Sequence, residues 1–240
     1  MNAATSRRAP AGASLRSFGS RILAMALLAS CSTETLFLSD FDETPVGQPP
    51  AVEQSVGTAH VDGPAGTVVV VESPALPSGR WLQIGRQSGP LVSGLQGKFD
   101  EFRGDGRYTF AATMFLPVDV QVATIQFETF SNPPTNRQAF LHLDLTSDNK
   151  VRIDDDDQTK FGSFPRGQPF LVQVTLDIGA AQSRAHVVLA GDGASGEREY
   201  VVPTPMHGAS RQFGAIRIWQ GFPHLGAFQA TNIVVTKHEE

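Results

Sequence analysis

The sequence predicts an all-β protein whose strands form a two-sheet antiparallel sandwich. The 240-residue chain contains 23 glycines and 16 prolines, and after residue 31 no apolar pattern with the helical period of 3.6 persists for ten residues. Short runs rich in β-branched and aromatic residues recur instead, with turn residues between them. Strands at this spacing favour packed antiparallel sheets over a parallel α/β fold.

The first strands can be assigned in chain order. Residues 36–41 open the domain, and residues 42–50 form a loop rich in Pro and Gly. Residues 67–72 are a valine-rich run suited to a buried strand. Residues 81–84 follow as a short strand that begins with Trp81, which we expect in the core because an apolar strand follows it.

The middle and the end of the chain are rich in hairpins. Turn sequences such as Gly104-Asp105-Gly106, Asn132-Pro133-Pro134 and Gly191-Asp192-Gly193 separate the apolar segments. The strands predicted here are residues 108–116, 123–130, 139–145, 150–154, 170–178, 184–189, 214–220 and 228–236.

Several of these strands alternate between apolar and polar residues. In residues 139–145, three leucines at alternate positions point to the core, whereas Phe140, His142 and Asp144 point to the opposite face. The candidate ligand-binding residues on such opposite faces are Gln126, Glu128, His142, Asp144, Arg152, Arg217 and Trp219. If their strands share a sheet, these side chains form a polar surface that bears an aromatic ring.

Such a surface suits carbohydrate. Sugar hydroxyl pairs bind amides, carboxylates and guanidinium groups, and the C–H faces of sugar rings stack on aromatic side chains. The alternative interpretation is the ordinary solvated face of a half-buried antiparallel sheet, which shows the same alternation.

The first thirty residues have the pattern of an export signal. They contain four arginines and no acidic residue, followed by the apolar run from Ile22 to Ala29. As a helix this run would rise about 12 Å, far less than the roughly 30 Å hydrocarbon core of a bilayer. We therefore expect a removable signal over residues 1–30 rather than a permanent span.

The signal ends in Leu28-Ala29-Ser30-Cys31, which resembles the lipobox of bacterial lipoproteins. The resemblance implies cleavage before Cys31, lipid on its thiol, and retention on a membrane through several fatty chains. Ser32 after the cysteine resembles the outer-membrane sorting pattern of Gram-negative lipoproteins. An ordinary secretory signal with a chance cysteine is the alternative.

Charge and cysteine content exclude other classes. Removal of residues 1–30 takes away four of the 19 basic residues and none of the 24 acidic ones, so a nucleic-acid partner is not expected. Cys31 is the single cysteine, so no internal disulfide can form and stability must come from core packing. Residues 31–240 are expected to form one domain, because no segment reads as a long linker.

A fold family is indicated by four segments in order. They are Asp40 to Gly47, Gly106 to Phe110, Gly167 to Leu176, and Phe228 to Val235. Together they resemble the concanavalin A-like, laminin-G-like jelly roll, over about residues 35–237. The resemblance implies a jelly-roll sandwich, but relatives of that fold include lectins, glucanases and alginate lyases, so it does not choose a function.

The motifs of the catalytic relatives are missing. The Glu-x-Asp-x-x-Glu strand of the retaining glucanases, which places two carboxyl groups about 5 Å apart, does not occur. The lyase relatives place Gln and His two residues apart on one strand, whereas here Glu128 follows Gln126 and His142 lies on another strand. We therefore predict that the protein is not an enzyme.

No cofactor is expected, and no metal site is assigned. Structural calcium has two candidate sets, the run of four acids at Asp154–Asp157 and the group Asp40, Asp42 and Asn232. Consecutive acids alternate in direction, so the run is better explained as a strand end in a solvated turn. The histidines show no zinc-ligand spacing.

The predicted function is that of an exported, membrane-anchored lipoprotein of the outer membrane, whose β-sandwich binds polysaccharide or another cell-envelope component without cleaving it. A structural or adhesive envelope module without a small ligand is the second hypothesis. A polysaccharide lyase or glycoside hydrolase with an atypical site is the third.

Overall fold

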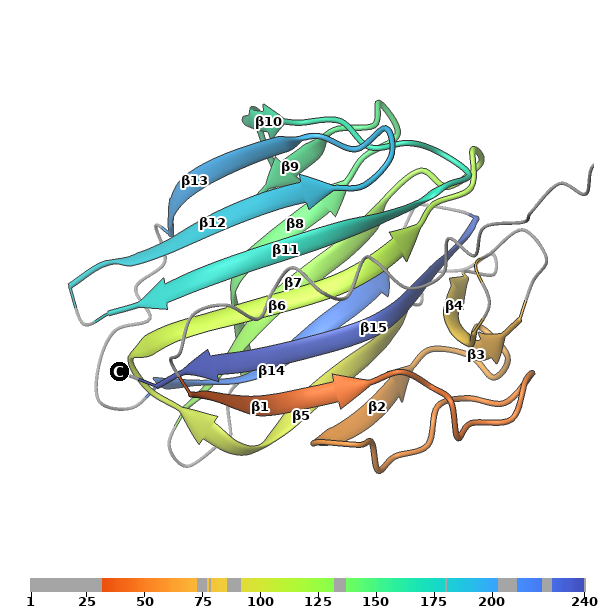
Figure 1. Cartoon of the computed structure of the whole chain (residues 1–240), viewed down its shortest axis with the longest axis horizontal. Coiled ribbons are helices and arrows are strands. Elements are labelled where there is room, and N and C mark those ends of the chain that lie inside the picture. The colour runs from red at the N-terminus through yellow and green to blue at the C-terminus, as the bar shows by residue number, and fades with distance from the viewer. Residues whose placement is uncertain are drawn as a thin grey trace, which may run out of the picture. The chain divides into compact units, whose positions relative to one another are not determined.

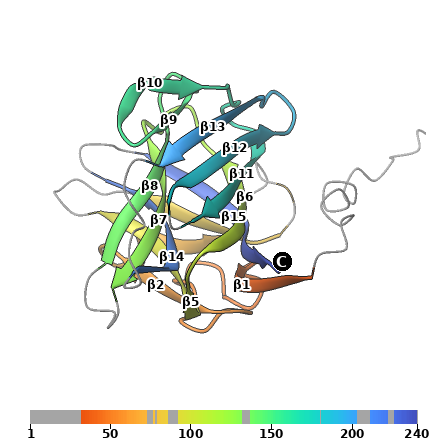
Figure 2. The same ribbon diagram turned by 90° about the vertical axis from the view of Figure 1, so that its left-hand side faces the viewer.

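The computed structural model describes residues 32–72, 77, 79–85, 92–131, 137–179, 181–202, 211–221 and 226–239. These residues form two stacked antiparallel β-sheets and contain no helix (Figures 1 and 2). The predicted all-β sandwich of two antiparallel sheets is therefore confirmed. Within the described residues, no helix has the length and apolar character needed to cross a membrane.

One sheet has eight strands, in the order β13-β12-β11-β6-β15-β4-β3, with β1 also paired to β15. Their bounds are β1 Thr33–Ser39, β3 Val68–Val71, β4 Trp81–Gly85, β6 Gly106–Phe115, β11 Pro169–Ile178, β12 Ser183–Ala190, β13 Gly196–Val202 and β15 Ala227–His238. The first and last strands of the domain are therefore neighbours, and β15 also pairs with β6.

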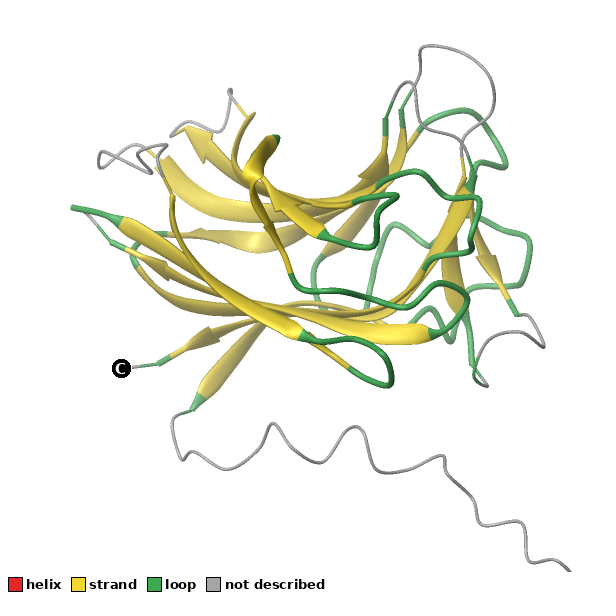
Figure 3. Cartoon of the chain, turned by 90° about the horizontal axis from the view of Figure 1, so that it is seen from above, coloured by secondary structure: helices red, strands yellow, loops and turns green. Residues whose placement is uncertain are grey.

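The other sheet has seven strands, in the order β10-β9-β8-β7-β14-β5-β2. Their bounds are β2 Thr58–Asp62, β5 Ser93–Arg103, β7 Ala123–Ser131, β8 Arg137–Leu145, β9 Val151–Ile153, β10 Asp156–Phe161 and β14 Arg211–Gln220. The two sheets bend together, so the face of this sheet that points away from the core lies on the concave side (Figure 3). We call this face the outer face.

The core fills the space between the sheets with the apolar members of the alternating strands. Aromatic rings form its centre: Phe213 packs edge-on against Phe99, Tyr108 and Phe140, at centroid distances of 4.9, 5.2 and 5.7 Å. Trp81 is 2% exposed, so its predicted burial is confirmed.

The alternation failed at one position in β8. Phe140 was expected on the outer face, but it is buried and joins the core. The strand pairing explains the difference, because Leu141 lies opposite Phe127 whereas Ala139 lies opposite Glu128, which leaves Phe140 as an extra residue in a β-bulge. The residues after the bulge, from Leu141 to Leu145, keep their expected faces, whereas Ala139 before it lies beside Glu128 on the opposite face from the leucines.

Candidate functional site

The strands that carry the candidate residues share the seven-stranded sheet, as the alternation required. Their apolar neighbours, such as Ile125, Leu143 and Ile216, belong to the core. Because side chains alternate along a strand, the polar partners lie on the outer face. The structure brings all seven candidate residues to this face: Gln126, Glu128, His142, Asp144, Arg152, Arg217 and Trp219.

Strand register arranges the outer face in rows that run across the strands. The central row is entirely polar and consists of His60, Gln96, Arg217, Gln126 and His142. One flanking row consists of Asp62, Gly94, Trp219, Thr124, Asp144 and Arg152. The row on the other side consists of Thr58, Lys98, Ala215, Glu128 and Ala139.

Glu128 is a fully buried carboxylate in the row next to the central one. Its Oε1 accepts a hydrogen bond from the Gln126 amide at 3.0 Å, and its Oε2 accepts one from the Gln96 amide. Amide donors on both oxygens offset part of the cost of burying the charge. Glu128 therefore orients the two glutamines of the central row.

Asp144 and Arg152 form the second polar centre. The Asp144 carboxylate is 4% exposed and accepts hydrogen bonds from Thr124 Oγ1 at 2.7 Å and from Arg152 Nη2 at 2.7 Å. Arg152 Nη2 also lies 2.9 Å from Asp155 Oδ1. Burial alone lowers the pKa of Arg152, but the hydrogen bond and charge of Asp144 outweigh it, so the pKa is raised above its usual value.

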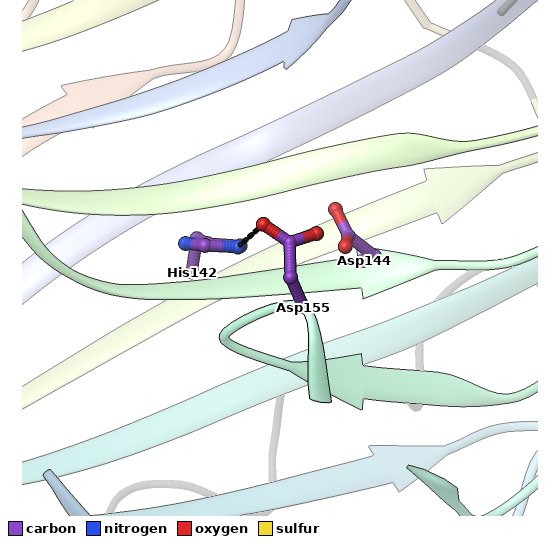
Figure 4. Close-up of side chains that lie close together, drawn as sticks. All are labelled: His142, Asp144 and Asp155. Atoms are coloured by element: carbon purple, nitrogen blue, oxygen red, sulfur yellow. Dashed lines mark hydrogen bonds and ion pairs between the residues drawn. The ribbon is translucent and has the colours of Figure 1, made fainter. Parts of the chain in front are cut away.

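As the sequence suggested, the acidic run Asp154–Asp157 begins at the end of β9 in a largely exposed turn, and the structure adds contacts between this turn and β8. Asp154 and Asp155 form the turn between β9 and β10 with φ values of 51° and 60°, a conformation that a hairpin turn of two residues requires. Asp154 Oδ1 accepts the His142 backbone N–H at 2.9 Å, and Asp155 Oδ2 lies 3.1 Å from His142 Nε2 (Figure 4). The turn is thus bound to β8.

A metal ion has a candidate position here, because single ligand atoms of His142, Asp144 and Asp155 lie within 4.8 Å of one another (Figure 4). However, the Arg152 guanidinium hydrogen-bonds to both carboxylates and already supplies the positive charge between them. A divalent ion would face this cation directly. In the other candidate set, the Asp40 carboxylate accepts the Asp42 backbone N–H at 3.2 Å, as in an ordinary turn.

Arg217 and Trp219 form the third centre of the outer face. Arg217 Nη2 donates to Asp62 Oδ2 at 2.6 Å, and its guanidinium carbon lies 5.2 Å from the centre of the Trp219 ring. A Cβ atom on Gly94 would lie 2.5 Å from Trp219 Cβ, so glycine is needed beside this tryptophan. Arg217 Nε and Trp219 Nε1 are buried donors without a hydrogen-bond partner among the described residues. Buried donors of this kind are uncommon in folded proteins.

The sequence alone did not identify the partners supplied by β2 and β5. They are Asp62, Gln96 and Lys98. Asp62 binds Arg217, and Gln96 binds Glu128. The ammonium of Lys98 lies 5.5 Å from the centre of the Phe102 ring, and Phe102 stacks on Phe130 at 4.6 Å. Gly94 and Gly97 interrupt the apolar pattern of β5, which removed the usual strand signal.

A cavity lies elsewhere, beside β1, with a volume of about 290 Å³. Its polar wall includes Arg103, which forms ion pairs with Glu34 and Glu101. The cavity contains none of the candidate residues.

Comparison with known proteins supports the fold. No protein-family model matches the chain, and no curated protein matches it. Among solved structures, the chain is similar to a protein of unknown function, SO2946 from Shewanella oneidensis MR-1, with 8% identity and a TM-score of 0.51, over 95% of this chain and 96% of that one.

Weaker similarities are to a lectin-like protein and an enzyme. Arcelin-5, a lectin-like defense protein from Phaseolus vulgaris, is 8% identical over 88% of this chain and 99% of that chain, with a TM-score of 0.49. A GH131 beta-glucanase catalytic domain from Podospora anserina is 11% identical over 84% of this chain and 95% of that chain, also with a TM-score of 0.49. Similarity at these levels concerns the fold alone and does not choose between binding and catalysis.

Proposed function

We propose that the outer face binds a polysaccharide or another carbohydrate of the cell envelope without cleaving it. The observation that supports this proposal is the composition of the face, where amides, carboxylates and guanidinium groups surround the partly exposed Trp219. Planar polar groups bind pairs of sugar hydroxyls, and an indole ring stacks on the C–H face of a sugar. The concave bend of the sheet suits an extended chain of sugars.

The charges of the face favour a neutral glycan over an acidic one. Arg217 is held by Asp62, and Arg152 is held by Asp144 and Asp155, so neither arginine is free to bind a carboxylate or sulfate of a ligand. Of the cations on the described part of the face, Lys98 is the one without an acidic partner. An anionic sugar at the centre would lie beside Asp62, Glu128 and Asp144 and would be repelled.

Trp219→Ala is expected to weaken glycan binding about tenfold, or by about 1.4 kcal/mol, because the stacking surface is removed. The measurement is retardation of the protein in native gels that contain hydroxyethylcellulose, dextran or galactomannan, with carboxymethylcellulose and dextran sulfate as acidic counterparts. Gln173→Ala, on the outer side of the other sheet, is the control and should bind like the unmodified protein.

Three outcomes separate the parts of this proposal. Retardation by a neutral gel that is lost in Trp219→Ala supports the assignment. Retardation by the acidic gels alone would keep carbohydrate binding but contradict the preference for neutral sugars. If no polysaccharide retards the folded protein, or if Trp219→Ala behaves like the control, the outer face is not the binding site.

We also propose that the chain is an exported lipoprotein, attached by lipid on Cys31 and sorted to the outer membrane. The lipobox-like sequence before Cys31 supports the lipid, and Ser32 supports the sorting. Carbohydrate binding by a domain attached in this way would hold a polysaccharide at the membrane surface.

A further inference from the structure

The folded domain begins immediately after Cys31. The backbone carbonyl of Ser32 accepts a hydrogen bond from the Glu239 N–H at 3.0 Å, and the Ser32 hydroxyl also contacts the Glu239 carboxylate. Thr33 is the first residue of β1 and pairs with His238 of β15. Ser32 is therefore fixed by the last residues of the domain, and no flexible linker separates it from the sheet.

This arrangement limits how far a lipid on Cys31 can lie from the sandwich. Neighbouring Cα atoms in a chain are 3.8 Å apart, so Cys31 lies within one residue of a hydrogen-bonded position. A linker of ten flexible residues would instead allow a mean separation of about 17 Å. We propose that the lipidated domain sits directly on the lipid headgroups, with the strand ends around Ser32 and Glu239 facing the bilayer. This inference rests on the proposed lipidation of Cys31.

Strand register identifies what else lies at this end. Arg107, near the start of β6, pairs with His238 on one side and with Asp177 of β11 on the other. The exposed turn that contains Asp105 connects β5 to β6 and lies at the same end (Figure 1). The surface that faces the headgroups thus includes the β5–β6 turn and the ends of β15 and β11.

The charges at this end are largely paired. Arg103 binds Glu34 and Glu101, and Arg107 binds Asp177 at 2.6 Å. Arginines that are neutralised by acidic side chains in this way give no strong attraction to anionic lipids. Contact with the bilayer therefore depends on the short covalent connection, and we expect it to persist at high salt.

The orientation can be measured with two cysteine variants at opposite ends of β6. Asp105→Cys lies at the proposed membrane end, and Val118→Cys, at a position that is 84% exposed, follows the far end. The ten residues of β6 separate these ends by about 30 Å. Because a lipidated Cys31 has no free thiol, a maleimide fluorophore labels the introduced cysteine alone. The full-length lipidated protein is placed in vesicles of phosphatidylethanolamine and phosphatidylglycerol that carry a nitroxide on their headgroups.

We expect the label at position 105 to be quenched several-fold more strongly than the label at position 118, with little change when salt is added. An insert of ten Gly and Ser residues between Cys31 and Ser32 should reduce the difference, because it restores a flexible linker. Equal quenching of the two labels on vesicle-bound protein would overturn the proposed orientation while leaving lipidation intact. A second labelled thiol at Cys31, or failure to bind vesicles, would instead contradict the lipidation itself.

Discussion

Arg166→Ala is expected to lower the free energy of unfolding by about 3 kcal/mol, the largest effect of a single substitution outside the core. Arg166 Nε donates to Asn149 Oδ1, Nη1 donates to the Val120 carbonyl, and Nη2 donates to the Thr146 carbonyl, each at 2.7 Å. Its guanidinium also lies 5.4 Å from the centre of the Phe164 ring.

The reason for the large effect is that one side chain joins three connections between strands. Arg166 belongs to the β10–β11 connection, and the carbonyl groups that it binds in the β6–β7 and β8–β9 connections would lose a charged donor together. Burial lowers the pKa of Arg166, although the charges of Asp119 and Asp148 partly oppose it. The guanidinium is thus held by neutral oxygens rather than by a carboxylate.

Thermal unfolding measured by circular dichroism gives the test. For a domain of this size, 3 kcal/mol corresponds to a fall in Tm of about 6–12 °C. Arg184→Ala is the matched control, because Arg184 is exposed and its guanidinium contacts Gln182 at 3.3 Å. The control should change stability by less than about 0.5 kcal/mol. An Arg166→Ala protein that melts with the control would show that the connections hold their positions without the guanidinium.

Cys31→Ser is expected to abolish membrane retention while leaving the sandwich folded. Serine has no thiol to receive the lipid, and residue 31 lies before the first residue of β1. The expected result is complete loss of labelling by a fatty-acid probe and transfer of the protein from the membrane fraction to the soluble fraction. The circular dichroism spectrum and the Tm of the purified domain should not change.

The control for this experiment is Ser32→Ala, which keeps the thiol and its lipid. It should retain the fatty-acid label, because only the hydroxyl that contacts Glu239 is lost. Labelling that persists in Cys31→Ser, or membrane retention without labelling, would show that another part of the chain provides the attachment.

Much of the sandwich and of the candidate site followed from local patterns. Alternation in β7, β8 and β14 identified the outer-face residues, because a strand with one buried face must place its polar residues on the other. The valine run predicted β3, and the turn sequences between apolar segments marked where the other strands begin and end. These signals lie within a few residues of one another, so a sequence shows them directly.

Four strands, β2, β5, β10 and β13, were not predicted, because the contacts that stabilise them involve residues distant in the sequence. In β5, Gly97 fits because the Phe37 ring from the opposite sheet fills its space; a Cβ there would lie 2.7 Å from the ring. In β13, polar residues alternate with partly buried ones at a sheet edge. The strands β2 and β10 are short edge strands that start in polar sequence. Consequently Asp62, Gln96 and Lys98 could not be placed beside the predicted residues.

The pairing of β1 with β15 has a mechanical consequence for a domain attached at its N-terminus. If the lipid holds residue 31 while a glycan pulls on the outer face, the load runs along β1 and acts across its six register pairs with β15 at once. Hydrogen bonds perpendicular to the pulling direction share such a shearing load, whereas a load across the strand would break them one after another. The first strand would then resist extraction as a unit, and the domain should stay folded under tension.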